Sequence, residues 1–219
     1  MTERIEPLIP SPAEAEQAAY WARLYGRWEP MPLARVRTLM DGFPRPWWVV
    51  GGWSIDAFVG RRREHSDVDM SIFSSDVPAL REHLRDRYHV WNLAGGDMRP
   101  LTDAHPEIIA PVSQVWIREH GDGPWLVDIP LTADEDGMWT NKFLRTHRLP
   151  LDDATWVADD GIRYMRPEIT VFFKARTRRT KDERDFALVL PALDGPRRAW
   201  LRSAITEAYG DDHPWLSRI

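Results

Sequence analysis

Two short segments of this 219-residue chain hold residue types suited to phosphate and metal chemistry. In the first, an apolar run ends in Gly51-Gly52 and a segment of helical character follows, with Ser54 in its first turn. Glycines at such a junction let the backbone approach a ligand closely, because no Cβ intervenes. The start of a helix presents free N–H groups and the positive end of its dipole to an anion. Gly51, Gly52 and the hydroxyl of Ser54 are therefore predicted to bind phosphate.

The second segment contains two aspartates, Asp67 and Asp69, inside an otherwise apolar run. Side chains alternate along a strand, so both carboxylates would project from one face. Val68, Met70 and Ile72 would fill the other face. Parallel carboxylates repel each other unless a cation lies between them, and Mg²⁺ is a hard ion that prefers oxygen ligands. A Gly-Gly turn and an Asp-x-Asp pair are each common alone, but both within about 20 residues favour metal-assisted phosphate chemistry over a solvated strand face.

The elements that must position these residues alternate between helical and strand character. An Asp-Gly turn at 122–123 lies between two apolar runs and indicates a β-hairpin, which argues against a doubly wound parallel sheet. The sequence thus predicts an α/β (α+β) fold, with a small mixed β-sheet flanked by helices and a C-terminal helical subdomain. We expect an N-terminal helical segment over 1–45, a core over 46–135 and a mostly helical subdomain over 136–219. The expected helices cover 12–26, 33–40, 53–59, 78–86, 167–177, 181–190 and 196–208, and the expected strands cover 47–50, 67–73, 88–93, 112–118 and 125–131.

Composition excludes several classes of function. The chain has no cysteine, so disulfides, thiolate metal sites and cysteine nucleophiles are excluded. The N-terminus lacks the pattern of a secretory signal, and no uninterrupted apolar stretch approaches ~18 residues, so we expect a cytoplasmic protein without a membrane span. The formal net charge of −5 argues against non-specific nucleic-acid binding, which needs a basic surface.

At this point the sequence resembles a known group of enzymes. Gly51-Gly52-Trp53-Ser54 followed by Asp67-Val68-Asp69 is similar to the signature of the DNA polymerase β-like nucleotidyltransferase superfamily. The string up to Asp56 and the residues Arg63-Glu64-His65 resemble its antibiotic-modifying branch, which includes aminoglycoside and lincosamide nucleotidyltransferases. Later strings at 167–168, 174–175, 181–182 and 185–186 resemble the same branch, so the resemblance spans roughly 47–193.

The resemblance implies a nucleotidyltransferase fold and a Mg²⁺-dependent transfer of a nucleoside monophosphate from a nucleoside triphosphate, with ATP as the expected donor. It also implies a small hydroxylated acceptor, such as an aminoglycoside-like or lincosamide-like antibiotic. A third metal-binding acid is implied on a neighbouring strand, and Asp128 is the best candidate, because an acid inside an apolar strand is hard to explain by solvation. Asp122 and Asp134 are weaker candidates in polar segments. Lys174 matches the family's C-terminal string and is the leading cation for the triphosphate, with a helix-surface lysine as the alternative.

The implied mechanism gives each acid a task. Asp67 and Asp69 would ligate the metal ions, and Asp128 would ligate or adjoin the acceptor-side ion and take the proton of the acceptor hydroxyl. The basic run 61–63 is most simply an exposed loop, although Arg63 is an alternative phosphate ligand. Asp182 and Asp185 lie three apart on one helix face, where we expect them to pair with basic neighbours.

Three other functions remain open at this level. The acceptor could be a protein or an RNA, as in toxin–antitoxin nucleotidyltransferases, although those minimal forms tend to be shorter. The chain could be a non-catalytic nucleotide-binding module, which the presence of all three acids disfavours. A hydrolase that uses the acids on a metal-bound water is the third, and the Gly51-Gly52 turn and the absence of a histidine-rich cluster argue against it. Oligomeric state cannot be predicted from the sequence.

Overall fold

The computed structural model describes residues 12–61, 63–65 and 67–219. Its internal contacts divide the chain into two compact units. We call Trp48–Arg63 with Glu135–Ile219 the helical unit, and the described residues up to Trp47 with Glu64–Asp134 the sheet unit. The segments 1–45, 46–135 and 136–219 stay a prediction, and in the structure residues 48–63 pack with elements that come much later in the chain. The first eleven residues of segment 1–45 lie outside the described part.

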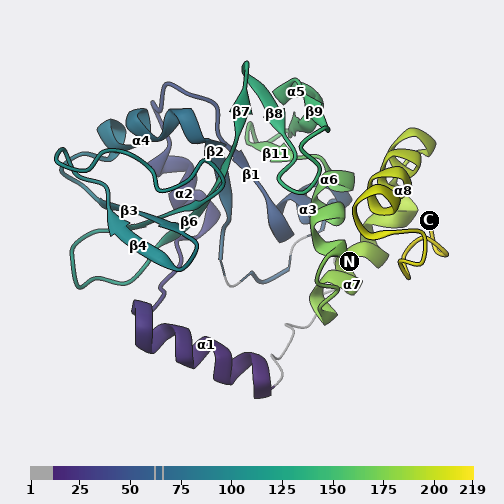
Figure 1. Ribbon diagram of the computed structural model, residues 1–219, viewed down its shortest axis with the longest axis horizontal. Helices are drawn as coiled ribbons and strands as arrows, with labels where there is room; N and C mark the ends of the chain where they lie inside the picture. The colour runs from purple at the N-terminus through teal and green to yellow at the C-terminus, as the bar shows by residue number, and fades with distance from the viewer. Residues whose placement is uncertain (1–11, 62, 66) are drawn as a thin grey trace. The chain divides into compact units, whose positions relative to one another are not determined.

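The sheet unit is built on five strands in the order β2-β6-β5-β3-β4 (Figure 1). β2 and β6 are parallel, whereas β5 pairs antiparallel with β6 and β3 pairs antiparallel with both β5 and β4. The β5–β6 hairpin confirms the prediction from the Asp-Gly turn. The strands are β2 (Met70–Phe73), β3 (His89–Ala94), β4 (Asp97–Pro100), β5 (Gln114–Arg118) and β6 (Val127–Thr132), and the helices are α1 (Pro12–Tyr25), α2 (Leu33–Leu39) and α4 (Val77–Leu84), with a 3-10 turn at Ser74–Asp76.

Alternation along these strands separates a buried face from a polar one. Val115 and Ile117 on β5 and Ile129 on β6 are fully buried. The residues between them, Trp116 and Asp128, are directly opposite each other and share the other face. The sheet therefore has one face that forms the core and one face available for function.

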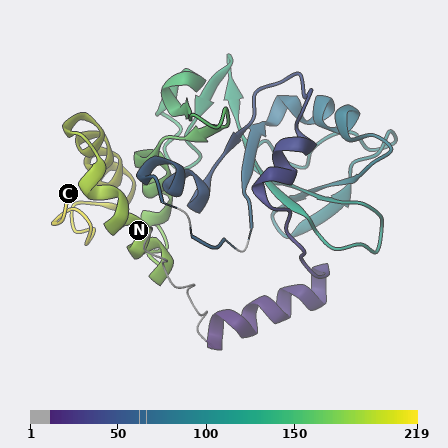
Figure 2. The same ribbon diagram turned by 180° about the vertical axis from the view of Figure 1, so that it is seen from behind.

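The helical unit has its own strands, in the order β10-β11-β1, with β1 (Trp48–Val49) parallel to β11 (Arg163–Met165). Helices α3, α6, α7 and α8 pack against one another, and Figure 2 shows them from the opposite side to Figure 1. The remaining elements are α3 (Gly51–Val59), β7 (Asp134–Glu135) at the boundary of the units, β8 (Met138–Thr140), β9 (Arg148–Leu149), α5 (Leu151–Ala154), β10 (Thr155–Val157), α6 (Pro167–Ala175), α7 (Thr180–Val189), a 3-10 turn at Leu190–Ala192 and α8 (Gly195–Tyr209).

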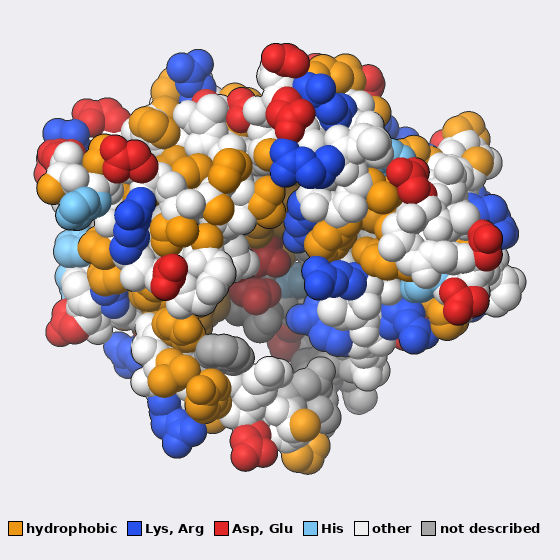
Figure 3. Space-filling model, in the orientation of Figure 1, with side chains coloured by type: hydrophobic (Ala, Val, Ile, Leu, Met, Phe, Trp, Pro, Cys, Tyr) orange, Lys and Arg blue, Asp and Glu red, His pale blue; other side chains and the backbone are white. Residues whose placement is uncertain are grey.

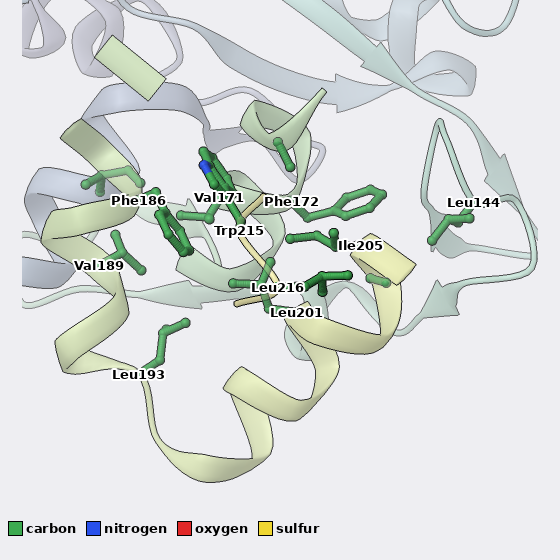
Figure 4. Close-up of a cluster of buried hydrophobic side chains, with 13 residues drawn as sticks. Leu144, Val171, Phe172, Phe186, Val189, Leu193, Leu201, Ile205, Trp215 and Leu216 are labelled. Carbon is green, nitrogen blue, oxygen red and sulfur yellow. The ribbon is translucent and has the colours of Figure 1, made fainter. Parts of the chain in front are cut away.

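A hydrophobic cluster holds these helices together (Figure 4). Within this cluster Phe186 of α7 stacks on Trp215, with ring centroids 4.1 Å apart and nearly parallel planes. Both side chains are fully buried. The indole Nε1 of Trp215 donates to Glu183 Oε1 at 2.7 Å, so the polar atom of this large ring is satisfied inside the cluster.

These observations confirm the predicted α/β fold, a mixed sheet with helices. The predicted helices 12–26, 33–40 and 181–190 agree with α1, α2 and α7 to within one residue at each end. No element was predicted between 136 and 166, and this stretch contains four short strands, β8 to β11, which are too brief to show a two-residue period in the sequence.

Acidic, basic and hydrophobic side chains are intermixed on the face of the molecule in Figure 3. Among the described residues, no helix has the length and apolar character needed to cross a bilayer.

Replacing Trp215 by alanine is expected to lower the free energy of unfolding by about 3–5 kcal/mol, because it opens a cavity against Phe186. Denaturant unfolding followed by circular dichroism measures this loss. The control is Tyr20→Ala, an aromatic side chain that is 47% exposed, which should change the value by about 0.5 kcal/mol or less. Equal effects of the two substitutions would contradict the proposed role of the stack.

Candidate active site

Two of the predicted catalytic acids meet at the end of the parallel pair in the sheet unit. Asp69 lies one residue before β2, and it forms an isolated parallel bridge with Asp128 of β6. Bridge partners on adjacent strands place their side chains on the same face. Val68 and Met70, on either side of Asp69, are buried on the opposite face, as predicted. The fold thus brings together two acids that are 59 residues apart in the sequence.

The carboxylate of Asp128 is held by two side chains of the neighbouring strand β5. Trp116 Nε1 donates to Asp128 Oδ1 at 3.0 Å, and Gln114 Nε2 donates to Asp128 Oδ2 at 3.2 Å. Because each oxygen receives a donor, the carboxylate has a fixed orientation. Neither hydrogen bond was predicted from the sequence, although the alternation of Gln114 and Trp116 across the hairpin from Asp128 would have been a usable signal.

Asp67 is exposed and lies outside β2, which begins at Met70 rather than at the predicted residue 67. Among the described residues, no three His, Cys, Asp or Glu side chains are arranged closely enough to hold a metal ion. The chemistry of the donors nevertheless suits Mg²⁺, because Asp67, Asp69 and Asp128 offer only carboxylate oxygens. Their assignment as metal ligands stays a prediction.

The Gly51-Gly52 turn belongs to the helical unit, where it forms the start of α3. Gly51 has φ +70°, a conformation that L side chains rarely adopt, so glycine is required there. The preceding residue, Val50, is extended and contributes no side-chain hydrogen bond to the helix start. The first turn of α3 therefore has the backbone geometry and dipole of an anion site.

Ser54 follows in this first turn, but its side chain is fully buried. Its hydroxyl lies 2.9 Å from the carbonyl oxygen of Gly51 and 2.9 Å from Thr170 Oγ1 on α6. The hydroxyl thus fixes α3 to α6 and shapes the glycine turn. Direct phosphate binding by Ser54 stays a prediction. In this arrangement the Ser54 hydroxyl holds the glycine turn, which is predicted to bind the phosphates.

Arg63 is part of a buried ionic cluster rather than of an exposed loop, because its side chain is only 11% exposed. Its guanidinium donates to Asp56 Oδ1 at 2.7 Å and to Asp185 Oδ1 at 2.5 Å. It also donates to the carbonyl oxygen of Gly52 at 3.3 Å. Arg63 therefore connects the glycine turn, the body of α3 and α7. The prediction of an exposed loop is wrong at Arg63, because the two buried carboxylates require a cation.

Lys174, the predicted triphosphate cation, belongs to the same cluster. Its Nζ lies 2.9 Å from Asp185 Oδ2 and 3.3 Å from Asp182 Oδ1. Asp182 also accepts from Arg179, with Nε at 2.9 Å, and from the hydroxyl of Thr177. Asp182 and Asp185 were expected to pair with basic neighbours. Asp185 pairs with Arg63 and Lys174, which belong to other elements of the chain. A nucleotide-binding role for Lys174 stays a prediction, since two carboxylates already engage its ammonium group.

The sequence of the chain is similar to a known family over part of its length. Residues 32–101 match the model of the aminoglycoside-2''-adenylyltransferase family. The matched segment includes Gly51, Gly52, Asp67 and Asp69. It confirms the predicted resemblance to the antibiotic-modifying branch and, with it, the predicted enzyme class, a nucleotidyltransferase. No curated protein sequence matches the chain.

Solved structures share the fold. The crystal structure of ANT(2'')-Ia in complex with adenylyl-2''-tobramycin has a TM-score of 0.51 at 17% identity, over 81% of this chain and 96% of that one. The solution structure of the same antibiotic-resistance factor has a TM-score of 0.51 at 18% identity, over 81% and 90%. The lincomycin-bound lincosamide adenylyltransferase LnuA has a TM-score of 0.48 at 19% identity, over 72% and 93%. The first two confirm the predicted nucleotidyltransferase fold.

Replacing Arg63 by methionine should lower the free energy of unfolding by about 3 kcal/mol, because it leaves Asp56 and Asp185 buried without their shared cation. Denaturant titration measures the effect. Arg61→Met removes the same charge from an exposed position two residues away and should change stability by about 0.5 kcal/mol or less. If the two variants are equally stable, Arg63 does not hold the cluster together.

The pKa of Asp182 gives a second prediction. Burial would raise this pKa, but hydrogen bonds from Arg179 and Thr177 and the charge of Lys174 outweigh it and hold the pKa below the ordinary 3.8. A depressed pKa contributes stability above pH 3.8 that is lost as the pH falls through the lower, folded-state value. The stability difference between the wild type and Asp182→Asn should therefore shrink as the pH falls below about 4.

Unfolding titrations at a series of pH values measure this difference. Asp211→Asn, on an exposed segment, controls for the change in net charge. A wild-type advantage over Asp182→Asn that stays constant down to pH 2 would contradict the role of the ionised carboxylate.

Proposed function

We propose that this chain is a Mg²⁺-dependent adenylyltransferase, with ATP as the donor and a hydroxyl of a small antibiotic-like molecule as the acceptor. The observation that carries the proposal is the pairing of Asp69 with Asp128 on adjacent parallel strands. The family match supports it, because residues 32–101 include both the glycine turn and the Asp67/Asp69 pair. We propose the cytoplasm as its place of action.

The glycine turn binds the triphosphate in this proposal. Gly51 and Gly52 give the phosphates close access to backbone N–H groups at the start of α3, and the helix dipole favours their negative charge there. Ser54 and Arg63 keep the turn in shape through the contacts with Gly51 and Gly52 described above. Positive charge from Lys174 near the leaving group would further stabilise developing negative charge, and this role is part of the proposal.

The acids carry the metal and the proton transfer. Asp67, Asp69 and Asp128 would hold Mg²⁺, which supplies charge neutralisation at the phosphates when bound. The acceptor oxygen attacks the α-phosphorus of ATP and forms a new P–O bond. The bond from that phosphorus to the bridging oxygen breaks, and pyrophosphate leaves. Asp128 takes the proton of the acceptor hydroxyl, and the donors Trp116 and Gln114 keep its carboxylate oriented for this task.

Asp67→Asn and Asp69→Asn should each lower the rate of adenylyl transfer by about 100-fold or more, the scale expected when an electrostatic partner of the transition state is lost. Pyrophosphate release with Mg²⁺, labelled ATP and a panel of hydroxylated antibiotics measures the rate. Asp122→Asn, in the exposed β5–β6 turn, is the matched control and should retain wild-type activity.

Calorimetry supplies an independent readout of donor binding. ATP should bind to the wild-type protein in the presence of Mg²⁺ and bind much more weakly when Mg²⁺ is chelated. An unchanged transfer rate in both aspartate variants would refute the metal assignment. A wild-type protein that binds no nucleoside triphosphate at all would refute the enzyme proposal.

A further inference from the structure

A pocket of about 440 Å³ opens within the sheet unit, on the same face of the sheet as Asp128. Its walls come from three segments that are distant in the sequence. The end of α1 supplies Tyr25 and the segment after it supplies Trp28. The β3–β4 hairpin supplies Leu93 and Asp97, and β5 supplies Gln114 and Trp116. Neither the family match nor the glycine and aspartate motifs assign a function to this pocket.

Two wall residues connect the pocket to the proposed proton acceptor. Gln114 and Trp116 line the pocket and also donate the two hydrogen bonds that hold Asp128. Trp116 and Asp128 are direct cross-strand partners, so their side chains are neighbours on one face. A molecule seated against Trp116 would therefore lie beside the carboxylate that is proposed to take the acceptor's proton.

The wall is mainly aromatic and apolar. Trp28 and Trp116 meet edge to face, with ring centroids 4.8 Å apart, and Tyr25 meets Trp116 in the same way at 6.2 Å. Leu93 adds aliphatic surface. Asp97 is the one charged residue among the lining residues described. A ligand with several positive charges would lose hydration against such a wall without enough carboxylates to replace it, whereas a nonpolar ring or alkyl group would gain by burial.

We infer that this pocket binds the acceptor, and that the acceptor is a hydroxylated small molecule with a nonpolar ring or alkyl face and at most one amine. The inference rests on the proposed adenylyl transfer and specifies its substrate class. It differs from what the family match alone suggests, because aminoglycosides are polyamines. The adenine base of the donor is the competing occupant, and the experiment below distinguishes the two.

The decisive variant is Leu93→Glu, which adds a negative charge to the apolar wall. Lincomycin, which has one amine, and tobramycin, a polyamine, serve as probes with Mg²⁺ and ATP. For the wild type we expect a kcat/KM about tenfold or more higher for lincomycin than for tobramycin. Leu93→Glu should lower the value for lincomycin by about tenfold through KM and leave the KM for ATP unchanged.

Val112→Glu is the matched control, since it places the same charge on an exposed apolar residue of the same unit outside the pocket lining. It should not change either acceptor's kinetics. Trp28→Ala is a second test that leaves the sheet strands intact, and it should also raise the KM for lincomycin by about tenfold. Circular dichroism establishes that each variant is folded.

Several results would overturn the inference. One is a preference for tobramycin that increases in Leu93→Glu. Another is a KM for lincomycin that is unchanged in both pocket variants. The third is a rise in the KM for ATP in place of the expected rise in the KM for lincomycin. If neither probe is adenylylated, calorimetry with lincomycin decides, and absence of binding overturns the pocket assignment. ATP binding by the wild type is measured separately, so failure of the pocket assignment is distinguishable from failure of the proposed function.

Discussion

The arrangement of the sheet unit depends on bringing two carboxylates together on neighbouring parallel strands. Asp69 and Asp128 would repel each other in isolation, so the surrounding structure must hold them in place. Burial of Val68, Met70 and Ile129 on the opposite face fixes the register of both strands. Because a shift of one residue would turn the acids into the core, the hydrophobic pattern that stabilises the sheet also positions the site.

A second constraint acts in the helical unit, where side-chain hydrogen bonds hold the glycine turn in place. Ser54 is bonded to Thr170, and Arg63 joins the carbonyl of Gly52 to Asp185. These contacts explain why a helix with an extended and uncapped start keeps a defined first turn. The residues nearest the expected phosphates thus provide backbone groups, and the side chains around them provide rigidity.

The sequence predicted the parts of the fold whose patterns are long or chemically distinctive. The strand, glycine turn and helix at 47–59 and the hairpin at 112–131 were both recognisable, and Asp128 stood out as an acid in an apolar strand. The partners of Asp128 and of Arg63 were not predicted, because such pairs depend on register and on packing between elements far apart in the chain. The short strands between 138 and 165 also escaped prediction, since two or three residues show no periodicity.

The ionic cluster of the helical unit has a consequence for how nucleotide binding should respond to solution conditions. Within the described part of the chain, Arg63, Lys174 and Arg179 pair with the carboxylates of Asp56, Asp182 and Asp185, so these six charges compensate one another. Exposed, unpaired cations would make the attraction of a triphosphate sensitive to ionic strength. With these charges compensated internally, the proposed binding of a triphosphate would depend chiefly on backbone dipoles and divalent ions and would respond only weakly to monovalent salt.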